Sequence, residues 1–206
     1  MTVQIETADS TRVDIAAALA ALAAPPTLHG SRVRLRAPRA DDADALFALF
    51  SDPAVMRYWS RPPMTERAEA EAQLARWADG FASRGGISWA ITPGGTDEAI
   101  GSCSLFRIDP DHRRAEIGYA LRADQWGRGI AREATSLLLD WGFRTLGLHR
   151  VEADIDPRNA ASRGLLLRLG FASEGLLRER YFVAGEVTDT ELFGLLARDW
   201  RGQRAR

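Results

Sequence analysis

The feature that most constrains the fold is a segment in the middle of the chain, where a strand pattern gives way to a helix pattern across a turn with two glycines. Residues 115–122 have the alternation of a β-strand, Gly127 and Gly129 follow, and a helical pattern begins near Ala131. The first backbone N–H groups of a helix lack partners within it, and the helix dipole places positive charge at that end. The segment therefore predicts an anion-binding loop that suits a phosphate group.

Glycine spacing alone is weak evidence, because Gly-x-Gly is equally typical of an ordinary tight turn. The strand–turn–helix setting strengthens the phosphate interpretation, since Gly127 and Gly129 would let a phosphate approach the backbone closely. The segment lacks the lysine of a Walker loop and the Gly-x-Gly-x-x-Gly of a dinucleotide-binding loop. Arg128 could add a positive charge to the site or be a solvated helix residue.

The patterns on either side predict an α/β domain with a mixed, mostly antiparallel central sheet, flanked by helices and containing one parallel crossover. After a first strand at 33–36, we expect a helix capped by Asp41 or Asp42 and ended by Asp52-Pro53, then a second helix capped by Thr65. Strands are predicted next at 87–91, 100–108, 115–122 and 150–155, helices at 131–146 and 159–170, and two final strands at 176–183 and 188–196.

We divide the chain into an N-terminal extension (1–27), one globular domain (28–200) and a basic tail (201–206). Residues 13–23 have helical composition, and this helix could pack on the domain, pack on a partner or stay mobile. The apolar stretch at 15–24 is too short to cross a bilayer, and it follows acidic residues where a signal peptide carries positive charge. We therefore expect a soluble, cytoplasmic protein with no membrane partner, either a monomer or a homodimer.

Charge and cysteine content argue against several classes of protein. The chain has 27 basic and 28 acidic side chains, whereas a nucleic-acid-binding protein normally has a basic excess, so no nucleic-acid partner is expected. Cys103 is the only cysteine, which excludes an intrachain disulfide and a thiolate metal cluster, and we expect no metal. Its place in a predicted strand favours a small buried core residue over a nucleophile.

Two motifs carry a resemblance to a known family. The residues from Ala115-Glu116-Ile117-Gly118-Tyr119 through Glu133-Ala134 resemble the coenzyme-binding motif of the GNAT superfamily. The family loop, Arg/Gln-x-x-Gly-x-Gly/Ala, falls on Trp126, Gly129 and Ala131, and the tryptophan is familiar in the RimJ/RimL-like branch that acetylates ribosomal-protein N-termini. The run Asn159-Ala160-Ala161-Ser162 before Leu169-Gly170-Phe171 is similar to the family's second motif, although a capped helix ending in glycine would also explain it.

This resemblance implies the GNAT fold, with the parallel crossover at the coenzyme site, and an enzyme that uses acetyl-CoA as co-substrate. It implies transfer of the acetyl group to a primary amine by direct attack in a ternary complex. Backbone N–H groups of Tyr119, Ala120 and Leu121 would polarise the acetyl carbonyl. The other coenzyme contacts are expected from Trp126, Gly127, Arg128, Gly129, Ile130, Ala131, Asn159 and Ser162.

Glu116 is the candidate general base, because the family often has an acidic residue on this strand. An exposed carboxylate paired with Arg113, Arg114 or Arg122 is the plain alternative. Many GNAT enzymes have a tyrosine seven residues beyond the motif asparagine, but Leu166 stands there. The acid that protonates the thiolate is therefore expected to be Ser162, Tyr181 or solvent; Ser162 could equally be a first-turn helix serine.

The acceptor is open between three alternatives: a protein or peptide N-terminus, a small amine such as an amino acid, polyamine or drug, or none in a non-catalytic acetyl-CoA-binding module. Deprotonating an α-amine at pH 7 costs about 1 kcal/mol, against about 4.6 kcal/mol for a lysine-like amine. This difference and the branch resemblance favour the N-terminus. Residues expected near the acceptor are Met56, Tyr58, Trp59, Trp77, Tyr181 and Phe182, although aromatic residues there could equally be core.

Overall fold

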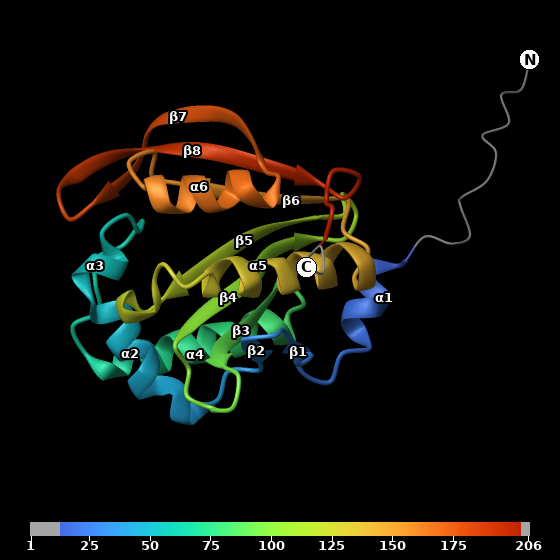
Figure 1. The fold of residues 1–206 in the computed structure, drawn as a ribbon, viewed down its shortest axis with the longest axis horizontal. Helices are drawn as coiled ribbons and strands as arrows, with labels where there is room; N and C mark the ends of the chain where they lie inside the picture. The colour runs from blue at the N-terminus through green and yellow to red at the C-terminus, as the bar shows by residue number, and fades with distance from the viewer. Residues whose placement is uncertain (1–12, 203–206) are drawn as a thin grey trace, which may run out of the picture.

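The structure is a computed structural model that describes residues 13–202 of the chain. An eight-stranded sheet with the order β1-β2-β3-β4-β5-β6-β8-β7 forms its centre, with helices packed against it (Figure 1). The helices are α1 (Ile15–Ala20), α2 (Ala43–Ser51), α3 (Pro53–Met56), α4 (Arg67–Ala82), α5 (Ile130–Asp140) and α6 (Ala160–Leu169). The strands are β1 (Leu28–His29), β2 (Val33–Arg36), β3 (Gly86–Pro93), β4 (Gly101–Asp109), β5 (Arg114–Leu121), β6 (Arg150–Ile155), β7 (Ala172–Val183) and β8 (Glu186–Leu196).

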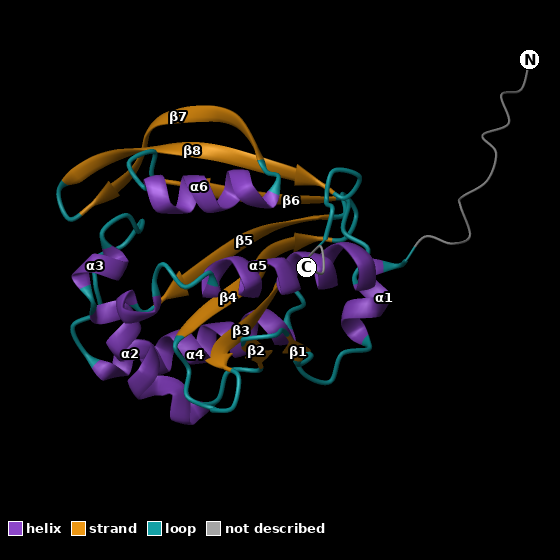
Figure 2. Cartoon of the chain, viewed as in Figure 1, coloured by secondary structure: helices purple, strands orange, loops and turns teal. Residues whose placement is uncertain are grey.

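The sheet is antiparallel except at its centre, where β5 and β6 run parallel. These two strands pair only over three residues, from Arg114 opposite Arg150 to Glu116 opposite Glu152. Beyond Glu116 they diverge, so the β6–β8–β7 part and α6 stand apart from the β1–β5 part in the view of Figure 2. The predicted fold class, a mostly antiparallel sheet with one parallel pair, is confirmed.

Two apolar clusters pack on opposite faces of the sheet, as the alternation of β5 makes clear. Ile117 and Leu121 belong to the larger cluster with residues of α1, α5 and α6, whereas Ala120 belongs to a smaller one with α2, α3 and α4. Cys103 lies in the larger cluster and is 1% exposed, which confirms it as a core residue. Burial raises the pKa of its thiol, so the protonated form is favoured.

The ends of the helices differ from prediction in places. Thr65 is not the cap of α4: Glu66 holds that position, and the Glu69 side chain accepts bonds from the Thr65 and Glu66 amides. Asp52 ends α2 as expected but also caps the short α3, where Pro53 is tolerated in the first turn. The long helix predicted at 131–146 ends at Asp140, and Trp141–Thr145 continues it as a π-helical turn.

Helix α1 lies within the main core. Ile15 and Leu19 are 2% and 1% exposed and pack in the larger cluster. The Trp89 ring nitrogen donates to the Pro26 carbonyl at 2.7 Å, which ties the following segment to β3. Of the three alternatives for this helix, the structure therefore shows packing on the domain; residues 1–12 of the predicted extension and 203–206 of the predicted tail lie outside the described residues.

Candidate active site

The predicted phosphate loop connects β5 to α5 through a 3₁₀ turn at Ala123–Gln125. Gly127 and Gly129 both have φ of +74°, a left-handed conformation that side chains other than glycine rarely adopt. Gly129 is the residue before the first turn of α5, so the unpaired amides of that turn follow it directly. The ring nitrogen of Trp126 donates to the Leu121 carbonyl at 2.8 Å, and half of this side chain remains exposed.

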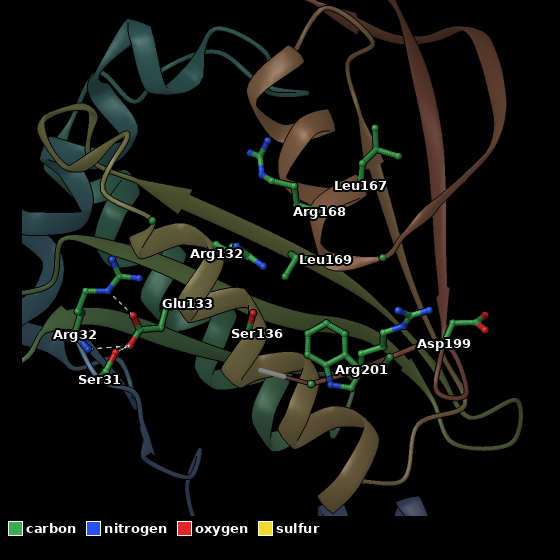
Figure 3. Close-up of a pocket in the computed structure, with 14 residues that line it drawn as sticks. Ser31, Arg32, Arg132, Glu133, Ser136, Leu167, Arg168, Leu169, Asp199 and Arg201 are labelled. Carbon is green, nitrogen blue, oxygen red and sulfur yellow. Dashed lines mark hydrogen bonds and ion pairs between the residues drawn. The ribbon is translucent and has the colours of Figure 1, made fainter. Parts of the chain in front are cut away.

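A cleft of about 1220 Å³ lies between α5 and α6, next to this loop (Figure 3). Its wall includes four arginines and two carboxylates: Arg32, Arg132, Arg168, Arg201, Glu133 and Asp199. Figure 3 shows these side chains coming from both helices, the C-terminal segment and the turn before β2. The excess of positive charge beside a helix N-terminus suits a ligand with several phosphates.

A second cavity, of about 360 Å³, lies between the diverging strands β5 and β6. Glu116, Gly118 and Tyr119 line one side and Asp154 and Asp156 the other. Asn159 and Ser162 at the start of α6, Tyr58 and Trp59 after α3, and Tyr181 and Asp189 of the β7–β8 pair complete it. The cavity thus brings together all three predicted catalytic residues, Glu116, Ser162 and Tyr181.

Glu116 is a half-buried carboxylate with 18% of its side chain exposed. Arg107 Nη1 donates to both of its oxygens, at 2.9 and 3.0 Å. The plain alternative was therefore right that Glu116 has an arginine partner but wrong about which one, because Arg113, Arg114 and Arg122 bond elsewhere. Arg107 reaches Glu116 because the β4–β5 register shifts after Phe106 and Arg107 has a φ of +49°. Such a bulge turns a side chain that regular pairing would place elsewhere.

The hydroxyls of Tyr119 and Ser162 lie 2.6 Å apart and link β5 to α6. Burial raises the pKa of Tyr119 to about 12, partly offset by this hydrogen bond. The phenol therefore stays protonated near neutral pH and can act as a donor. Sequence reasoning assigned Tyr119 only a backbone role, and the signal for its side chain, a cross-element contact over 43 residues, is not local.

Tyr181 donates its hydroxyl proton to Asp154 Oδ2 at 2.7 Å. Desolvation and the neighbouring carboxylate raise the pKa of Tyr181. A register shift between Leu177 and Tyr181 directs this part of β7, and the Glu179 amide there donates to Asp189 at 2.8 Å. Asp154, Asp189 and Arg107 are cavity residues that sequence reasoning missed, since each lies on a strand with no motif around it.

The other predicted residues divide between site and core. Asn159 caps α6 by accepting from the Ser162 amide at 3.0 Å, so its side chain already has a structural role. Ala120 and Leu121 are buried, Ile130 is 9% exposed, and Ala131 is partly buried against the larger cluster. Arg128 is exposed, and its carbonyl accepts from Arg32 Nη1 at 2.8 Å. Leu166, at the position where many GNAT enzymes have a tyrosine, is fully buried and packs in the core.

The residues expected near the acceptor also divide. Tyr58, Trp59 and Tyr181 line the cavity between β5 and β6. Met56 and Trp77 pack in the smaller apolar cluster, and Phe182 is 75% exposed at the outer end of β7. Within residues 13–202, no helix is long and apolar enough to span a membrane, and no group of three or more potential metal ligands is present.

Comparison with known families identifies the class of protein to which this fold and its two cavities belong. The family described as Acetyltransferase (GNAT) domain matches residues 32–172. The chain therefore belongs to the GNAT family of N-acetyltransferases, for which acetyl-CoA is the implied co-substrate. The resemblance to the superfamily is thereby confirmed.

Three relatives and one solved structure are similar to this chain over most of its length. The N-acetyltransferase p20 of Bacillus licheniformis, itself uncharacterised, is 39% identical over 85% of this chain and 99% of its own length. YdaF of Bacillus subtilis, whose name gives it as a proposed ribosomal N-acetyltransferase, is 30% identical over 71% of this chain and 79% of its own. The spermidine N(1)-acetyltransferase of Escherichia coli K12 is 28% identical over 78% and 83%. A GCN5-related N-acetyltransferase from Brucella melitensis superposes with a TM-score of 0.74 at 30% identity, over 85% of this chain and 80% of that one.

Proposed function

We propose that this enzyme transfers an acetyl group from acetyl-CoA to a primary amine by direct attack in the cavity between β5 and β6. The observation that carries the proposal is the pair of spaces along β5 and the loop that follows it, a carboxylate-lined cavity where the strands diverge and a basic cleft at the phosphate loop. The residues fit the coenzyme: the amides after Gly129 and the surrounding arginines suit its phosphates. The coenzyme supplies the activated acetyl thioester.

In this proposal Glu116 accepts the proton of the attacking amine, directly or through one water. Tyr119, Ala120 and Leu121 lie on β5 beyond the last pair with β6. The Arg122 amide donates to the Ile100 carbonyl at 2.9 Å, and amides alternate between the two edges of a strand, so the Ala120 amide faces β4 as well. The Tyr119 and Leu121 amides face β6, where they can polarise a carbonyl. The hydroxyls of Tyr119 and Ser162, 2.6 Å apart, form a donor pair for the departing sulfur, and Tyr181 is the other candidate. Leu166, being buried in the core, has no part in this chemistry.

For the acceptor we favour a protein or peptide N-terminus, in line with the RimJ/RimL-like resemblance. Glu116 is one carboxylate held in place by Arg107, and a single carboxylate suits an amine needing only about 1 kcal/mol of deprotonation. The β7–β8 pair forms one wall of the cavity, along which an extended peptide acceptor could lie. The 30% identity to YdaF supports the same class.

A second candidate is a polyamine, because the cavity wall holds four carboxylates, Glu116, Asp154, Asp156 and Asp189, and one arginine, Arg107. Glu116 pairs with Arg107 and Asp156 with Arg158, while Asp154 and Asp189 have no ion pair within residues 13–202. An acceptor with a second positive charge would find its counter-charge there. The relation to a spermidine acetyltransferase supports this candidate.

The test is a comparison of kcat/KM for short peptides with free α-amines, polyamines, amino acids and aminoglycosides, followed through thiol release. We expect the best peptide to lead. A small amine that exceeds every peptide by about tenfold, or about 1.4 kcal/mol of transition-state stabilisation, would overturn the acceptor while leaving acetyl transfer intact. Binding of acetyl-CoA without turnover on any amine would instead indicate a non-catalytic module.

A further inference from the structure

The turn between β1 and β2 is fastened to the start of α5 by one carboxylate. Glu133 accepts hydrogen bonds from the Ser31 hydroxyl at 3.0 Å, the Arg32 amide at 2.8 Å and Arg32 Nε at 2.7 Å (Figure 3). A Cβ built on Gly30 would lie 2.4 Å from the same carboxylate, so a larger residue there would displace it. Two segments a hundred residues apart thus meet beside the phosphate loop.

Glu133 is ionised in this position. Burial alone would raise its pKa, but the bonds from the Arg32 amide, the Arg32 guanidinium and Ser31 outweigh that effect and lower it. Only 5% of the Glu133 side chain is exposed, whereas 58% of Arg32 is. The carboxylate is therefore the fixed member of the pair, and the guanidinium is the member that faces the cleft.

The Arg32 guanidinium also contacts the phosphate loop. Nη1 donates to the Arg128 carbonyl at 2.8 Å, and a Cβ built on Gly129 would lie 3.2 Å from Nη2. The guanidinium thus lies directly against the peptide that joins the two residues before α5. In a trans peptide the carbonyl and the N–H point in opposite directions, so the bond that fixes the Arg128 carbonyl also fixes the direction of the Gly129 amide. The amides that follow are those of the first turn of α5.

We propose that Glu133 and Arg32 are a positioning pair that keeps the phosphate loop in its anion-binding conformation. The inference rests on the proposed coenzyme site and adds residues to it that lie outside the loop motif. Its consequence is selective: the pair contributes to binding of thioesters that carry the coenzyme's phosphates and contributes nothing to thioesters that lack them. A general role in stability would affect both kinds of donor.

The primary test compares acetyl-CoA with S-acetylpantetheine as acetyl donors for Arg32→Gln. We expect KM for acetyl-CoA to rise at least tenfold with kcat at saturation little changed, and kcat/KM for S-acetylpantetheine to stay within twofold of wild type. Arg32→Lys should resemble Arg32→Gln, because an ammonium cannot reach Glu133 and the Arg128 carbonyl together. Arg144→Gln, which removes an exposed arginine paired with Asp140, is the charge-matched control.

Glu133→Gln separates positioning from charge balance. If the carboxylate positions Arg32, its loss should weaken acetyl-CoA binding at least tenfold by calorimetry; if it merely opposes the phosphates, its loss should tighten binding. Tighter binding, or an equal loss with S-acetylpantetheine, would overturn the inference.

Gly129→Val tests the phosphate loop itself. Unchanged affinity for acetyl-CoA in this variant would rule out the proposed coenzyme site. If Gly129→Val loses affinity while Arg32→Gln binds acetyl-CoA as wild type does, the coenzyme site stands and only the positioning pair is ruled out.

Discussion

At the scale of single residues, the contact between Arg107 and Glu116 determines what the candidate base can do. A carboxylate that accepts two bonds from one guanidinium is held in a fixed orientation. An amine entering the cavity therefore meets a Glu116 carboxylate of fixed orientation, whose lone pairs are shared with the Arg107 guanidinium. This arrangement suits an attacking amine that loses its proton easily near pH 7.

We predict that Glu116→Gln lowers kcat by about 10² to 10⁴ while changing KM for acetyl-CoA only slightly, because a general base acts in the transition state. Steady-state kinetics over a range of pH is the measurement. Glu98→Gln, an exposed carboxylate paired with Arg122, is the matched control and should behave as wild type. A variant at Glu116 with the wild-type rate and pH profile would show that the residue is structural.

A second prediction at this scale follows from Tyr119. Its pKa is raised to about 12, so between pH 10 and pH 12 the folded protein keeps a proton that the unfolded chain loses. The free energy of unfolding should then fall with rising pH, by at most about 1.4 kcal/mol per pH unit from this group. Denaturant unfolding at several pH values should give a shallower fall for Tyr119→Phe. Equal slopes for the two proteins would contradict the shift.

At the scale of elements, the loop before α5 depends on two left-handed glycines. We predict that Gly129→Val abolishes measurable acetyl-CoA binding, because the side chain is strained at φ +74° and would press on the Arg32 guanidinium. Calorimetry, with folding checked by circular dichroism, is the measurement. Gly185→Val in the β7–β8 turn shares the left-handed strain, with φ of +90° and open space around it, and should keep coenzyme affinity.

Elements whose signals are local were predictable from the sequence. Strand β6 has the predicted bounds, and α6 has its predicted caps, because Asn159 and Gly170 each act on the adjacent backbone. Strand β1, with two residues, is too short to show a pattern. The side-chain pairs of the candidate site were not predictable: Arg107 reaches Glu116 through a shift in register, and Arg32 reaches Glu133 from a distant turn.

At the scale of the whole molecule, the core extends beyond the residues that match the family. The match covers 32–172, yet Ile15 and Leu19 before it and Phe193 and Leu195 after it are buried in the larger cluster. The segment that matches the family is therefore shorter than the segment that shares one hydrophobic core. Removing α1 should cost stability even though no site residue lies on it.

We predict that Leu19→Ala lowers the free energy of unfolding by about 2 to 5 kcal/mol, the usual cost of truncating a fully buried leucine. Chemical denaturation followed by circular dichroism measures it. Leu176→Ala on β7, where the side chain is 53% exposed, is the control and should change stability by less than about 1 kcal/mol. A loss at Leu19 no greater than at Leu176 would mean that α1 docks only loosely.

The short pairing of β5 with β6 has a consequence for motion. Three residue pairs at one end join the two parts of the sheet, so the strands beyond them can change their separation without breaking the ladder on either outer side. Any ligand that hydrogen-bonds to both inner edges would tie the two parts together, and its occupancy would then set how far β5 and β6 can move relative to each other. Amide exchange in β5 beyond Glu116 should accordingly slow when a donor is bound, while exchange in β3 should stay as it was.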